Sequence, residues 1–122
     1  MDNFKKFIYS LTIAISGVKL ALKEEQSFRI QSLIGIIVFL LMFILGLTLI
    51  EKTILILVIS MVLGLELVNS QIEKVLDLIQ PAYNLKVKFI KDLSAGAVLV
   101  AVLGSIIVGF IIFTPYICRL LN

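Results

Sequence analysis

The sequence predicts an all-α membrane protein in which an N-terminal amphipathic surface helix precedes three transmembrane helices. Of the 122 residues, 61% are hydrophobic, and the mean hydropathy is +1.16, whereas apolar residues make up about half of an ordinary soluble domain. Three long stretches also approach the roughly 20 predominantly apolar residues that a helix needs to cross a bilayer. We therefore expect residues 1–122 to form a single membrane-embedded domain.

The surface helix is expected at about residues 4–28. Apolar residues between Phe4 and Ile15 recur at steps of three and four, while Lys5 and Lys6 fall elsewhere on the helical wheel. This spacing is typical of an amphipathic helix that lies in the membrane interface. We expect this segment to lie on the membrane instead of crossing it.

The three spans follow from the length of the apolar runs. The first run carries no charge, and the second is free of charge only in its first half. A tight turn at Glu51 and Lys52 is expected between them, and Pro81 should end the second helix, because the residue before a proline disfavours the helical conformation. The spans are expected at about residues 32–50, 53–79 and 91–117.

Basic residues predict the orientation. The chain has 11 lysines and arginines, of which only Lys52 and Arg119 lie on one side of the expected spans and the other nine on the opposite side. The positive-inside rule then places the N-terminus and the 74–94 connection in the cytoplasm. The polar half of the second span thus opens toward cytoplasmic nucleotides.

Composition excludes several kinds of chemistry. There is no histidine, and the single cysteine, Cys118, has no internal disulfide partner. The net charge of +3 is too small to indicate nucleic acid as a partner. Any chemistry must therefore use carboxylates, amides, hydroxyls and lysines.

The segment LELVNSQIEKVLDLI, residues 65–79, places polar side chains on one face of the second span. At 100° per residue these side chains share a stripe about 100° wide, and the opposite face is apolar. A carboxylate near the middle of a membrane is costly and usually faces a bundle interior or a water-filled cavity. We call these five residues the polar stripe: Glu66, Asn69, Ser70, Glu73 and Asp77.

The residue types of the polar stripe are compatible with two functions. Hard oxygen ligands suit Mg²⁺, which proteins usually hold with one or two carboxylates and substrate phosphates. A carboxylate can also accept a proton, so both phosphoryl transfer and proton-coupled transport are possible. In the plainer reading, Glu73 and Asp77 are solvated at the headgroups and pair with Lys74 or Lys88.

Four motifs resemble those of the prokaryotic diacylglycerol kinase family, which includes undecaprenol kinases. They are ELVNSQIEKVLD at 66–77, PAY at 81–83, KDLSAGAVLV at 91–100 and EQSFRI at 25–30. Gly17 and Lys19 also fall where the family has a glycine and a basic residue. Two departures, Gln71 where the family usually has alanine and Gln31 where it often has glutamate or histidine, replace no motif residue.

The resemblance implies a homotrimeric lipid kinase of the inner membrane that uses ATP and Mg²⁺, with active sites shared between subunits on the cytoplasmic side. Glu66 is then the general base for the lipid hydroxyl, and Glu25 and Glu73 hold Mg²⁺. A homotrimer also suits the polar stripe, which neighbouring copies would shield. The implied nucleotide contacts are Gly17, Lys19, Glu25, Asn69, Glu73, Asp77, Lys91 and Asp92, and the implied lipid contacts are Glu66, Arg29, Ala95 and Gly96.

The lipid substrate and some residue roles have alternatives. Diacylglycerol, converted to phosphatidic acid, is the main expectation, whereas the segments FRI and LDLIQPAY lean toward undecaprenol; a small proton-coupled transporter is the non-kinase alternative. Lys91 and Arg29 could extend to lipid headgroups, and Asp92 could cap the third span. The simplest reading of Ala95 and Gly96 is close helix packing, and that of Phe28 and Tyr83 is anchoring at the interface.

Overall fold

The computed structural model describes residues 2–122, which form four α-helices and, within that range, no β-strand. The helices are α1 (Asn3–Glu24), α2 (Gln26–Ile44), α3 (Leu49–Ile79) and α4 (Leu85–Leu121). Three of them, α2, α3 and α4, are long and apolar enough to cross a membrane. The predicted fold class, with one N-terminal helix ahead of three spans, is therefore confirmed.

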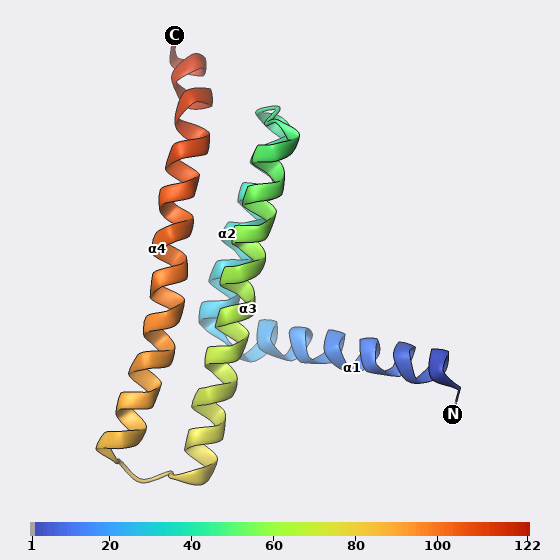
Figure 1. Cartoon of the computed structure of the whole chain (residues 1–122), viewed down its shortest axis with the longest axis vertical. Helices are drawn as coiled ribbons and strands as arrows, with labels where there is room; N and C mark the ends of the chain where they lie inside the picture. The colour runs from blue at the N-terminus through green and yellow to red at the C-terminus, as the bar shows by residue number, and fades with distance from the viewer. Residues whose placement is uncertain (1) are drawn as a thin grey trace.

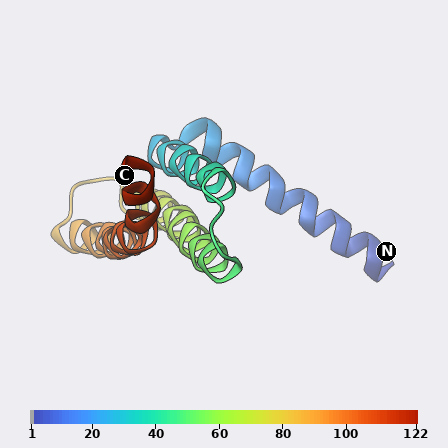
Figure 2. The ribbon, with the colours of Figure 1, turned by 90° about the horizontal axis from the view of Figure 1, so that it is seen from above.

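Helix α3 is the centre of the arrangement, because it packs against both α2 and α4. These three helices run side by side, and α1 leaves them sideways from the half of the molecule that holds the α3–α4 connection (Figure 1). The view from above shows α1 projecting well beyond the other helices (Figure 2). Among the described residues only eight hydrophobic side chains are buried, so the three spans enclose a small interior.

The surface helix ends earlier than predicted, at Glu24 instead of about residue 28. Glu25 adopts an extended conformation, with φ −104° and ψ 106°, which stops α1 and lets α2 begin in a new direction. The Arg29 guanidinium then donates hydrogen bonds to the carbonyl oxygens of Leu22 (3.1 Å) and Lys23 (2.7 Å). These carbonyls belong to the last turn of α1, where no partner exists within the helix.

The turn between α2 and α3 lies at residues 45–48, so the predicted turn at Glu51 and Lys52 is wrong. Gly46 has φ +68°, a left-handed conformation that costs glycine little. Its N–H donates to the Phe43 carbonyl at 3.3 Å, and the Leu47 N–H donates to the Met42 carbonyl at 3.0 Å. These two bonds make a Schellman motif, which ends α2.

Glu51 belongs to the first turn of α3 instead of to a loop. The Thr48 hydroxyl accepts from the Glu51 N–H at 3.2 Å, and the Glu51 carboxylate accepts from the Thr48 N–H at 2.9 Å. This reciprocal pair is a capping box, which satisfies two free donors at a helix start. The Glu51 carboxylate also accepts a hydrogen bond from the Tyr116 hydroxyl, which ties the turn to α4.

At the connection between α3 and α4, the predicted end of α3 is confirmed and the predicted N-cap of the next helix is wrong. Helix α3 ends at Ile79, just before Pro81, as predicted. Helix α4 begins at Leu85, and its N-cap is Asn84, whose side chain accepts from the backbone of the first turn. Asp92 is two turns inside α4, so its predicted role as N-cap is wrong.

The apolar packing is concentrated toward the α2–α3 turn, where Met42, Leu47, Leu55 and Ile112 form the buried cluster. One glycine sits at a close helix approach: a Cβ on Gly35 would lie 3.0 Å from the Ile59 side chain. The spans are thus held together at the end opposite the α3–α4 connection, which leaves the other end for polar residues.

Two expectations about single side chains are corrected. Phe28, expected as an interfacial anchor, is only 4% exposed and lies beside a groove that Val18 and Leu22 of α1 also line. Gly96, expected at a close helix contact, would meet nothing within 4 Å if it carried a Cβ. Phe28 therefore belongs to the α1–α2 junction, and the face of α4 around Gly96 is uncovered within one chain.

Candidate active site

The polar stripe lies along the half of α3 that approaches the α3–α4 connection, and its burial decreases along the helix. Glu66 is 5% exposed and is the one buried charged side chain among the described residues. Asn69, Ser70 and Glu73 are partly buried, and Asp77 is exposed. The stripe therefore leads from the interior of the spans to the polar end of the molecule.

Glu66 is buried within a single chain, so neighbouring copies are not needed to shield it. Glu73 lies two helical turns beyond Glu66 on the same stripe of α3, and Glu25 is tied to the neighbouring Lys74 by an ion pair. These carboxylates carry like charges, so they repel one another. A cation bound among them would reduce that repulsion.

The side-chain amide of Asn69 has one hydrogen-bonding atom with a partner and one without. Its Nδ2 atom donates to Glu73 Oε1 at 3.3 Å, and its Oδ1 atom is buried without a hydrogen-bond partner among the described residues. A buried acceptor without a partner costs free energy, so it normally has a ligand, a water or an ion to satisfy it. The Asn69 oxygen and the Glu73 carboxylate point to a ligand that carries positive charge or donates hydrogen bonds.

The donor set fits Mg²⁺ in its chemistry. Amide and carboxylate oxygens are hard ligands, and Mg²⁺ usually binds one or two carboxylates and completes its shell with water and substrate phosphates. Between residues 2 and 122, no three acidic, histidine or cysteine side chains converge closely enough to hold a metal by themselves. A metal at this site would accordingly need oxygen atoms from a phosphate substrate or from water.

Lys91 and Asp77 connect the two helices at the polar end. The Lys91 ammonium lies 2.5 Å from Asp77 Oδ1, which joins α4 to the end of α3. The Lys91 side chain is 35% exposed and that of Asp77 is 64% exposed. Lys91 is therefore held beside the polar stripe but remains accessible to a ligand from solvent.

The lysine partners of the carboxylates differ from those in the plainer sequence reading. Lys74 pairs with Glu25 at 2.8 Å, and Lys88 pairs with Asp92 at 2.7 Å. The sequence placed Lys74 beside Glu73 and Asp77 only, because it is close to them along α3. Its contact with the α1–α2 junction has no signal in the sequence.

Other predicted site residues lie at the margin of this cluster. Gly17 and Lys19 are exposed on α1, and a Cβ on Gly17 would meet nothing within 4 Å. Arg29, expected to contact lipid, is occupied with the carbonyls at the end of α1. Ala95 is exposed and Gly96 partly buried on α4.

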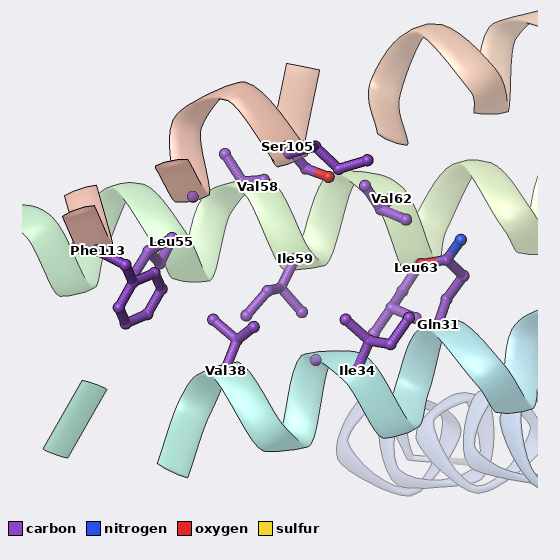
Figure 3. A pocket seen from close by; sticks show the side chains of 13 residues that line it. Gln31, Ile34, Val38, Leu55, Val58, Ile59, Val62, Leu63, Ser105 and Phe113 are labelled. Atoms are coloured by element: carbon purple, nitrogen blue, oxygen red, sulfur yellow. The ribbon is translucent and has the colours of Figure 1, made fainter. Parts of the chain in front are cut away.

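An apolar cleft of about 210 Å³ runs between α2, α3 and α4. Figure 3 shows its lining, in which Gln31 and Ser105 are the polar side chains among valines, leucines and isoleucines. Val62 and Leu63 also line the cleft, and they precede Glu66 by about one helical turn. The cleft therefore comes close to the buried carboxylate.

Comparison with known proteins agrees with these features. The family model for prokaryotic diacylglycerol kinase matches residues 12–113, a range that includes every candidate site residue. A diacylglycerol kinase from Synechocystis is 34% identical over 115 residues, which cover 93% of this chain and 66%, just under two thirds, of that relative.

Two further relatives match along most of both chains. An undecaprenol kinase from Bacillus subtilis is 32% identical over 114 residues, which cover 93% of each protein. A diacylglycerol kinase from Haemophilus influenzae is 34% identical over 107 residues, which cover 87% of this chain and 91% of that relative. With its three spans and its polar stripe, the chain belongs to the prokaryotic diacylglycerol kinase family.

Proposed function

We propose that this protein transfers the γ-phosphoryl group of ATP to the hydroxyl group of a membrane lipid alcohol. Diacylglycerol, which would give phosphatidic acid, is the first candidate substrate. The observation that carries the proposal is a buried carboxylate, Glu66, which lies about one helical turn from an apolar cleft and on the same stripe of α3 as Glu73.

In this proposal Glu25, Glu73 and the Asn69 Oδ1 atom hold Mg²⁺ together with the phosphates of ATP. The metal, when bound, neutralises charge on the β- and γ-phosphates, which is the main requirement of phosphoryl transfer. The Asn69 Oδ1 atom supports this role, since it is an acceptor to which no residue between 2 and 122 donates. Lys91 gives a further positive charge, because its ammonium is accessible and is held in place by Asp77.

Glu66 acts as the general base. As the lipid oxygen forms a bond to the γ-phosphorus, its proton moves to the Glu66 carboxylate and the bond to the departing ADP oxygen breaks. General bases of this kind contribute about 10²- to 10⁴-fold to a rate. Burial of Glu66 also keeps bulk water away from the reacting centre, which favours attack by the lipid over hydrolysis of ATP.

The apolar cleft supports a lipid substrate. Its lining between α2, α3 and α4 suits a hydrocarbon chain, and its Val62–Leu63 end would bring the head of that lipid toward Glu66. A soluble substrate would gain nothing from such a lining. The cleft has a volume of only about 210 Å³, so we assign it to one chain of the lipid.

Location and assembly are also part of the proposal. The nine basic residues on one side of the spans favour an inner-membrane protein with its N-terminus and active site in the cytoplasm. Phe4, Phe7 and Leu11 of α1 are 67%, 59% and 45% exposed, as a helix resting on lipid requires. A homotrimer is proposed from the resemblance to the family alone, because the apolar surface of the spans can equally face lipid.

Undecaprenol is the second candidate substrate, and one observation favours it. The segments FRI at 28–30 and LDLIQPAY at 76–83 lean toward undecaprenol kinases, whereas coverage does not separate the two, because an undecaprenol kinase matches over 93% of its length and a diacylglycerol kinase over 91%. The test is transfer of ³²P from [γ-³²P]ATP to diacylglycerol and to undecaprenol, measured side by side in detergent micelles. Label in neither lipid would refute the proposal, and the ratio of the two initial rates identifies the substrate.

A further inference from the structure

Among residues 2–122, Lys74 is the one cation that pairs with a proposed metal ligand, and it has no role in the proposed mechanism. Its ammonium lies 2.8 Å from Glu25 Oε1, and it directly follows Glu73 in α3. Glu25 is the single residue that separates α1 from α2. The ion pair therefore joins the α1–α2 junction to α3 next to Glu73.

Mg²⁺ and an ammonium group compete for the same carboxylate. Both are attracted by the negative charge of Glu25, and they repel each other at short range. A metal that binds Glu25 must consequently displace Lys74 or bind against its charge. The Lys74 side chain is 59% exposed and that of Glu25 is 24% exposed, so the lysine can move into solvent while the carboxylate stays in the site.

We infer that Lys74 is the resident counter-cation of Glu25, which a divalent metal displaces on binding, and that Lys74 thereby sets the metal concentration that the protein needs. This inference rests on the proposed function, because it takes Glu25 as a metal ligand. Exposed ion pairs are weak, so the effect is a tuning of metal affinity and leaves the fold intact.

The test measures metal binding without nucleotide and without turnover. Mn²⁺ is titrated into the full-length protein in a neutral maltoside detergent, and the free ion is followed by electron paramagnetic resonance. The variants are K74Q, E25Q and the double variant E25Q/K74Q. K86Q is the matched control, since Lys86 carries the same charge at the same end of the spans and forms no ion pair within residues 2–122.

We expect K74Q to bind Mn²⁺ about two- to fivefold more tightly than the parent, which is the range that an exposed ion pair can supply. E25Q should bind more weakly, K86Q should match the parent, and the gain from K74Q should shrink in the E25Q background. Thermal unfolding of K74Q checks that the protein remains folded.

Three results would overturn the inference, and they can be told apart. Unchanged or weaker binding by K74Q, with weaker binding by E25Q, removes the role of Lys74 and leaves Glu25 as a ligand. An equal gain with and without Glu25 shows that Lys74 acts as a general charge instead of through the ion pair. Unchanged binding by E25Q removes the metal role of Glu25, and the inference about Lys74 fails with it.

Discussion

Replacing Glu66 with glutamine removes the charge of the one buried carboxylate among the described residues and keeps its size. The side chain is 5% exposed, and within residues 2–122 it forms no ion pair. The substitution therefore breaks no ion pair and leaves no cavity. It also removes a buried charge that has no ion-pair partner within residues 2–122, and burying such a charge is costly, so we expect the free energy of unfolding to stay the same or rise.

The expected loss of activity follows from the burial of the site. A general base supplies about 10²- to 10⁴-fold in rate, or roughly 3 to 5 kcal/mol of activation free energy. Water has little access to a side chain that is 5% exposed, and Glu25 already pairs with Lys74. Neither is placed to replace Glu66, so the loss should lie near the upper end of that range.

Initial rates of ³²P transfer to lipid at saturating ATP measure this loss, and binding of a non-hydrolysable ATP analogue should remain near that of the parent. E66D is a second variant: its carboxylate is withdrawn by one methylene, and a displacement of about 1 Å can cost about 10²-fold. Thermal unfolding shows whether each variant is folded. A folded E66Q protein that keeps its rate within threefold of the parent would refute the role of Glu66 as base.

Three further substitutions probe the metal site, the α1–α2 junction and the α2–α3 turn. E73Q should raise the Mg²⁺ concentration for half-maximal activity by about tenfold, the scale on which metal sites respond to lost partners; an identical Mg²⁺ titration would count against Glu73 as a ligand. R29Q should free the Leu22 and Lys23 carbonyls at a cost of about 1.5–3 kcal/mol for hydrogen bonds to a charged group. Faster proteolysis at residues 22–26 measures that loss, and unchanged protection would show that the cap contributes nothing. G46A forces alanine into φ +68° at a cost of about 1–2 kcal/mol; the unfolding temperature should fall with no change in activity per folded molecule, and an unchanged temperature would contradict the strain.

The α2–α3 turn was readable in the sequence, and the prediction missed it. Gly46 and the pair Thr48–Glu51 are local signals for a helix end and a capping box. The prediction placed the first span at 32–50 because that run is uninterrupted by charge, but an apolar run does not have to be one helix. Leu47 is apolar because it packs in the buried cluster with Met42, although it lies outside α2.

The structure of the α1–α2 junction depends only in part on residues that are neighbours along the chain. The break at Glu25 depends on Arg29, whose guanidinium reaches back to carbonyls six and seven residues earlier. A long flexible side chain has many other possible partners, such as lipid headgroups, and the sequence does not choose among them. The predicted helix therefore extended to residue 28, past its real end.

The sequence alone predicts the helical class, the number of spans and the face of α3 that carries Glu66, Asn69 and Glu73. These properties depend on composition and on the period of the helix, which act between neighbours along the chain. Three features follow only from the packing of the helices: one chain buries Glu66, the Asn69 Oδ1 atom has no donor within residues 2–122, and Lys74 pairs with Glu25. Burial and ion pairing depend on which helices lie side by side. A pattern of neighbouring residues along the chain does not specify which helices pack against each other.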